Sequence, residues 1–266
     1  MNKYKAVIKV YFTSAIIKKA DFLGNIVINL IQVIAVVLLW LAIYDPSQKI
    51  NGYSLQDTIV YYALILLVTY ATTTDTSDYV ANSIKSGTLS EWLLRPRSIL
   101  LTELARSIGA QIYRLMVLIP IYLVIGFILV SLNIGISFSF GGIAIGMVFL
   151  LFGFIVNCLL EYTLAMFAFW MDEVWSIKHF KQLITDLLGG KHITLVFFPA
   201  IVLSINRFLP FQFIYFVPLE YILGKRQLVV NGPSDIFSLL IWIMLFLAIS
   251  ALLYKRGIEK YGAFGN

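Results

Sequence analysis

Long apolar runs alternate with short polar segments along most of the chain, and the runs have the length of membrane-spanning helices. A helix needs about 17–25 predominantly apolar residues to cross the hydrocarbon core of a bilayer. Five runs are at least this long, at residues 22–44, 58–74, 107–130, 140–170 and 237–254. The pattern therefore predicts an all-α membrane protein in which each run forms a transmembrane helix.

The first 20 residues have an amphipathic pattern instead. Apolar side chains recur at helical spacing against five lysines, Lys3, Lys5, Lys9, Lys18 and Lys19. Such a helix lies in the plane of the membrane surface, with its lysines toward anionic lipid headgroups. No apolar core precedes a small-residue cleavage site, so we do not expect a signal peptide.

A polar segment, residues 83–96, separates the second run from the third. Its sequence is S-I-K-S-G-T-L-S-E-W-L-L-R-P. Gly87 interrupts it, and Pro96 ends it because the residue before a proline is steered away from helix. The segment is amphipathic, which predicts a short helix at the membrane face with its polar side in water.

Small residues form a stripe in the fourth apolar run. Gly142-x-x-x-Gly146, followed by Gly153, recurs on one side of a helix. We interpret the stripe as a site of close helix packing and not as a ligand site.

Composition excludes soluble classes of protein. Mean hydropathy is +0.89 and 13% of residues are charged, a balance typical of polytopic membrane proteins. The single cysteine, Cys158, excludes an intrachain disulfide. At least 15 of the 20 Lys and Arg residues fall on the side of the two termini, which predicts cytoplasmic termini. The basic excess therefore reflects topology, and we expect no nucleic-acid partner.

Two motifs resemble those of one family. The first is Gly87-Thr88-Leu89 followed by Leu93-Leu94-Arg95-Pro96, and the second is Arg256-Gly257-x-x-x-Tyr261 near the C-terminus. In this order, with these spans between them, they resemble ABC-2-type ABC exporter permeases. Within that family they are similar to a subgroup of paired bacterial permeases.

The resemblance implies one permease domain, residues 1–266, with about six transmembrane helices. Residues 1–20 would be the elbow helix, residues 75–106 the cytoplasmic coupling loop, and residues 190–235 a re-entrant or extracellular region. The loop would dock on a separate ATPase subunit, which carries ATP and Mg, while a second permease copy or a homologue completes the pathway. The docking residues would be Lys85, Gly87, Thr88, Leu89, Glu91, Trp92, Arg95, Pro96 and Arg97. A prokaryotic cytoplasmic membrane is the implied location.

Two interpretations exist for the fifth span. In one, residues 172–190 are cytoplasmic and residues 193–209 cross the membrane. In the other, which follows the family, residues 173–189 form the span and the proline-containing stretch after them re-enters from the outer face. Lys178 and Lys181 weigh against the second, because a buried lysine is costly without a partner.

Motifs for catalysis or metal binding are absent from the sequence. Gly189-Gly190-Lys191 superficially resembles a nucleotide-binding loop, but Thr185 and His192 occupy positions that need Gly and Ser or Thr. His179 and His192 have no acid at ligand spacing. We therefore expect no catalytic residue, no metal and no cofactor on this chain.

Ionisable residues inside membrane spans are functional candidates by default. Arg114 lies in the third run, and Glu161 lies in the fourth with Asn157 one turn away. Arg114 and Glu161 could pair across adjacent antiparallel helices, or the three side chains could line a substrate path.

Other functions remain as alternatives to the exporter permease. A secondary transporter would need matching broken helices in two halves, and the two halves of this chain differ in span and loop lengths. An intramembrane enzyme would need paired catalytic residues. A non-transporting membrane scaffold is consistent with the same sequence.

Overall fold

Described regular structure is entirely helical in the computed structural model, which describes residues 2–45, 49–94, 98–131, 139–171 and 173–263. The α-helices are α1 (Asn2–Ile17), α2 (Lys19–Ile43), α3 (Leu55–Thr72), α4 (Thr76–Lys85), α5 (Leu89–Leu93), α6 (Ile99–Ser131), α7 (Phe140–Ala165), α8 (Trp175–Leu188), α9 (Ala200–Asn206), α10 (Phe216–Ile222) and α11 (Leu228–Ala263). Three short 3₁₀ helices accompany them, η1 (Met166–Phe169), η2 (Leu195–Phe197) and η3 (Phe211–Phe213).

Five helical stretches of the described chain are long and apolar enough to cross a membrane. They are Lys19–Ile43, Leu55–Lys85, Ile99–Ser131, Phe140–Phe169 and Leu228–Tyr261. Each covers one of the five predicted runs to within one residue, so the predicted all-α membrane protein is confirmed. Helix α6, the third of these stretches, begins at Ile99, eight residues before the apolar run at 107–130. It therefore includes the end of the predicted coupling loop.

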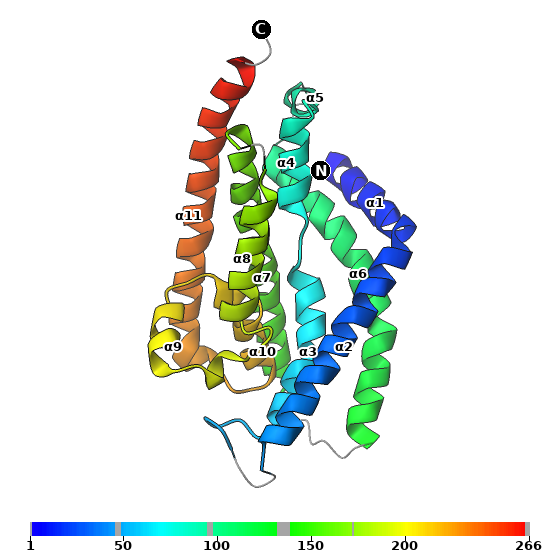
Figure 1. Ribbon diagram of the computed structural model, residues 1–266, viewed down its shortest axis with the longest axis vertical. Coiled ribbons are helices and arrows are strands. Elements are labelled where there is room, and N and C mark those ends of the chain that lie inside the picture. Colours follow the sequence, from blue (N-terminus) through cyan, green and yellow to red (C-terminus); the bar gives the residue numbers. More distant parts are fainter. Residues whose placement is uncertain (1, 46–48, 95–97, 132–138, 172, 264–266) are drawn as a thin grey trace.

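The helices form an elongated bundle (Figure 1). The start of α1, the short helix α5 and the C-terminal end of α11 lie at one end of the molecule, and the α2–α3 connection lies at the other. The start of α1 and the end of α11 therefore lie at the same end of the bundle. Helix α1 crosses α6, and Gly109 provides the closest approach, since a Cβ there would overlap the backbone of Ile8.

The glycine stripe of α7 is a packing surface, as predicted. A Cβ at Gly142 would lie 2.7 Å from the carbonyl oxygen of Tyr221, and one at Gly146 would lie 2.9 Å from that of Pro218. At Gly153 a Cβ would overlap the backbone of Phe213. The three glycines therefore let η3 and α10 lie directly on α7.

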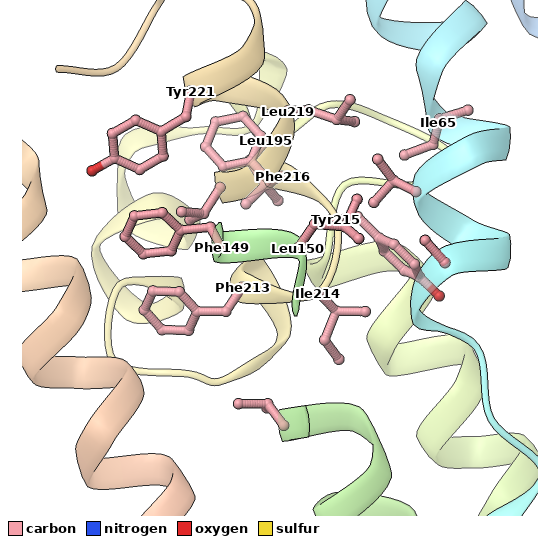
Figure 2. Packing of buried hydrophobic residues seen from close by; sticks show 14 of the residues in the cluster. Ile65, Phe149, Leu150, Leu195, Phe213, Ile214, Tyr215, Phe216, Leu219 and Tyr221 are labelled. Atoms are coloured by element: carbon pink, nitrogen blue, oxygen red, sulfur yellow. The ribbon is translucent and has the colours of Figure 1, made fainter. Parts of the chain in front are cut away.

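The largest core cluster sits at this contact (Figure 2). The ring of Tyr221 stacks on that of Phe149, with centroids 4.6 Å apart and planes 9° apart. Ile214, Tyr215 and Leu219 are fully buried beside it, between α7 and α3. The segment before α11 is therefore part of the protein interior and not a peripheral loop.

The interpretation in which residues 193–209 form the fifth span is wrong. That stretch is broken into η2 and α9, with Pro199 between them. Helix α9 has seven residues, or about 10 Å of helix, where a bilayer core needs about 30 Å. Residues 175–188 form α8, which lies along α7 and ends just before Gly189. Its 14 residues, or about 21 Å of helix, are also fewer than a bilayer core needs, and α8 is not among the five stretches long enough to cross. Gly190 follows with φ +84°, a conformation that favours glycine.

Glu220, on α10, is expected to make stability depend on pH. Burial raises the pKa of this carboxyl to about 7, against the opposing effect of Arg226 and Lys225, and the hydroxyl of Tyr53 donates a hydrogen bond to it. The native state keeps a proton that the unfolded chain loses above about pH 4.5, so the free energy of unfolding falls as pH rises through about 7, by on the order of 1–3 kcal/mol.

The comparison is thermal unfolding of the wild type and of Glu220→Gln at pH 5 and pH 8. Gln retains an acceptor for Tyr53 but does not titrate. The variant should lose part of the pH dependence, and an identical pH dependence in both proteins contradicts the prediction.

Candidate functional site

The predicted coupling segment folds as two short helices joined by a tight turn. Helix α4 ends at Lys85, and Gly87 takes φ +78°, which lets the chain reverse into α5. Leu89, the first residue of α5, is buried. The ring of Trp92 stacks on that of Tyr79, with centroids 5.4 Å apart and planes 21° apart. These contacts anchor α5 on the outside of α4.

The tip of this element is exposed. Side chains of Lys85, Thr88 and Glu91 face outward, and Leu94 is 86% exposed. An exposed leucine among polar side chains, at one end of the molecule, is suited to contact with another protein. Arg95, Pro96 and Arg97, which sequence analysis places in the same surface, lie outside the described residues.

The two motifs that carried the family resemblance touch each other. The hydroxyl of Tyr261, at the end of α11, donates to the carbonyl oxygen of Gly87 at 2.8 Å and lies 3.0 Å from the hydroxyl of Ser90. Gly257, one turn earlier, lies against the ring of Phe169, where a Cβ would overlap the ring. The C-terminal motif therefore holds α11 against η1 and ties it to the predicted coupling turn.

A break separates α3 from α4 at residues 73–75, and it leaves backbone carbonyl groups without helical partners. The side chain of Asn157, on α7, donates to the carbonyl oxygen of Thr72 at 2.9 Å. From α6, Arg114 and Gln111 donate to the carbonyl oxygen of Thr73 at 2.8 and 3.1 Å. Side chains of α6 and α7 thus supply the hydrogen bonds that these carbonyl groups lack within the helix. We call residues 72–77 the α3–α4 joint.

Glu161 binds the other side of the joint. Its Oε2 accepts hydrogen bonds from the backbone N–H of Ser77 at 3.1 Å and from the Ser77 hydroxyl at 2.8 Å. Ser77 lies in the first turn of α4, where the helix dipole favours a negative charge. The other oxygen, Oε1, accepts from Lys181 of α8 at 2.9 Å. Glu161 and Lys181 are 2% and 6% exposed, so this is a buried ion pair.

The pairing of Arg114 with Glu161 is therefore wrong, although both residues reach the same joint. Arg114 approaches from α6 and binds a carbonyl oxygen, whereas Glu161 approaches from α7 and binds Lys181. Lys181 also donates to Asn157 at 2.8 Å, which completes the cluster. Lys181 was absent from the predicted site. The sequence does carry a signal for Lys181: a lysine in an apolar environment needs a partner, and this cost weighed against a fifth span at residues 173–189.

A second ion cluster was also missed, because the sequence assigned its residues to the polar loop. Arg106 of α6 donates to Glu103 at 2.8 Å and to Asp75 of the joint at 2.9 Å. Its guanidinium lies over the ring of Tyr79, 4.3 Å from the centroid. The joint is therefore fixed from both sides by charged groups.

Neither histidine nor cysteine builds a further site within the described chain. No group of three or more His, Cys, Asp or Glu residues there could hold a metal ion. Cys158 is a free, fully buried thiol whose sulfur lies 3.5 Å from the hydroxyl of Thr76, the first residue of α4.

The fold and this site define a multi-pass helical membrane protein with a surface element tied to its transmembrane helices. The chain matches the family described as ABC-2 family transporter protein over residues 30–265, and it belongs to that family. The predicted family is thus confirmed, and the chain is a permease subunit of an ABC transporter. No curated protein and no solved structure matches it.

Proposed function

We propose that this chain is the membrane subunit of an ATP-driven exporter, and that a separate ATPase subunit docks on α4, α5 and the segment through Arg97. Two permease subunits, identical or homologous, would enclose the substrate pathway. ATP and Mg would bind to the ATPase alone. The membrane would be the cytoplasmic membrane of a prokaryote, with both termini and α5 on the cytoplasmic side, in keeping with the distribution of Lys and Arg.

The attachment of the exposed tip to the membrane helices is the observation that carries this proposal. Tyr261 ties the tip to α11, and Glu161 ties the first turn of α4 to α7 and α8. A displacement of α5 by a closing ATPase dimer would therefore be passed to three helices at once. In this mechanism the chain converts between two arrangements and performs no chemistry itself.

Arg114, Asn157 and Glu161 have a defined task in this mechanism. They hold the α3–α4 joint by hydrogen bonds to Thr73, Thr72 and Ser77. We propose that they keep the joint rigid, so that motion of the tip moves α3 instead of bending the chain. A role in lining a substrate path is secondary to this contact.

Co-purification with the ATPase encoded beside this chain tests the proposal. The variant is Glu91→Ala, Arg95→Ala and Arg97→Ala together, and we expect it to lose the ATPase, because it removes the charges whose complementarity would steer the partner and fix its register. The matched control is Asp45→Ala with Lys49→Ala, two exposed charged positions in the α2–α3 connection, which lies at the opposite end of the molecule.

Retention by the control and loss by the triple variant would support docking at the tip. Equal retention by both variants would move the contact elsewhere. Binding without ATP-dependent transport by the reconstituted complex would favour a scaffold. Failure of the wild-type chain to bind any adjacent ATPase would remove the proposal.

A further inference from the structure

A groove of about 440 Å³ lies between the α1–α2 corner, the α3–α4 joint and α6. Its volume falls in the range of about 300–1,000 Å³ that small-molecule sites occupy. Lys18, Asp21 and Phe22 line one side, and Tyr113 and Arg114 line the other. The proposed docking of the ATPase uses none of these side chains.

The groove lies at the level of lipid headgroups. From Asp21 to Ile43, the far end of α2, is about 33 Å of helix at about 1.5 Å per residue. From Arg114 to Ser131, the far end of α6, is about 26 Å by the same measure. Because the hydrocarbon core is about 30 Å thick, the groove falls at the edge of the core on the side of α4 and α5. A ligand that fits this depth is the headgroup of a lipid in that leaflet.

Charge in the groove favours an anion. Lys18, Arg106 and Arg114 are opposed by Asp21 and Asp75, so the lining carries one excess positive charge. Arg106 and Asp75 are already paired with each other. In the described part of the chain, Arg114 uses only Nη1 in hydrogen bonds, to Thr73 and Gln111. Its Nε and Nη2, and the ammonium of Lys18, therefore remain available to a ligand.

Beyond the groove, toward the far end of the molecule, the exposed faces of α2 and α6 are apolar. On α2, Leu23, Val27 and Ile28 are 47–55% exposed, and on α6 Met116 and Ile119 are 57% and 59% exposed. A molecule with an anionic head at Lys18 and apolar chains along α2 and α6 matches both parts of this surface.

We propose that the groove binds a glycerophospholipid of the leaflet on the α4–α5 side, with its phosphate on Lys18 and Arg114 and its acyl chains along α2 and α6. A bound lipid of this kind contacts the α1–α2 corner and α6 together. It therefore completes the packing beside the joint that Arg114 helps to fix.

Native mass spectrometry of the detergent-purified chain, titrated with phosphatidylglycerol, tests this site. The reference ligand is diacylglycerol with the same acyl chains, which lacks the phosphate. Lys18→Gln should lower the apparent affinity for phosphatidylglycerol about tenfold, as expected for the loss of one charge-assisted hydrogen bond. Lys18→Arg should restore it.

Lys19→Gln is the matched control. Lys19 is exposed and carries the same charge one residue further along the chain, but its side chain does not line the groove. This variant should leave the affinity unchanged. An equal loss in the two Gln variants would overturn the proposal in favour of diffuse attraction to headgroups. Equal binding of diacylglycerol would overturn it as well. Displacement by glycerol 3-phosphate at the same concentration would assign the site to a soluble phosphate ester instead.

Discussion

Replacing Lys181 with methionine is expected to lower the free energy of unfolding by about 3–5 kcal/mol, because it leaves the carboxylate of Glu161 buried without its cation. Glu161 would keep the hydrogen bonds from Ser77, but these do not neutralise a charge that is 2% exposed. Adding Glu161→Gln to the same chain should recover much of the loss, since the neutral amide can still accept from Ser77.

Unfolding in mixed detergent and dodecyl sulfate micelles measures this free energy for the two single variants and the double variant. Lys178→Met is the control on the same helix. Lys178 pairs with Asp78, whose side chain is 49% exposed, so its loss should cost at most about 1 kcal/mol. Equal losses at Lys178 and Lys181 would refute the buried pair.

The same measurement separates the observed pair from the one that sequence analysis considered. Arg114 and Glu161 bind different groups of the joint, so the effects of Arg114→Gln and Glu161→Gln should be closer to additive than those of Lys181→Met and Glu161→Gln. A stronger coupling of Glu161 to Arg114 than to Lys181 would contradict this prediction.

Replacing Gly153 with alanine is expected to destabilise the protein by about 1–3 kcal/mol, and leucine should cost more. A Cβ at this position overlaps the backbone of Phe213, which cannot turn aside as a flexible side chain can. The substitution therefore forces α7 away from η3 and opens the contact on which the largest core cluster is built.

Gly126→Ala is the matched control, since this glycine lies within α6 and a Cβ there meets no atom within 4 Å. Alanine has a higher helix propensity than glycine by about 1 kcal/mol, so this change should be neutral or stabilising. The same unfolding assay gives both values. A Gly153→Ala variant as stable as Gly126→Ala would mean that α7 and η3 are not in close contact.

Local patterns in the sequence were sufficient for the spans and for the glycine stripe. Apolar runs mark membrane helices because the bilayer demands length and hydrophobicity in each helix by itself. Gly142, Gly146 and Gly153 mark a packing face for the same reason, since their spacing is a property of one helix.

Contacts between distant segments were harder to predict. Lys181 looked unfavourable in a membrane until the structure placed Glu161 beside it, 20 residues earlier in the chain. The contact of Tyr261 with Gly87 joins positions 174 residues apart, and two separate motifs contain no information on their distance in space. The second apolar run was predicted to end at residue 74, within the α3–α4 break, but the sequence did not indicate that a helix, α4, resumes at once and continues to Lys85.

The burial of Cys158 gives the chain a built-in reporter. Its thiol is enclosed where the first residue of α4 meets α7, and within the described part of the molecule no solvent reaches it. A small maleimide can therefore modify the unaltered protein only when α4 separates from α7. The labelling rate of this one natural thiol follows the opening of the joint, without any substitution in the chain.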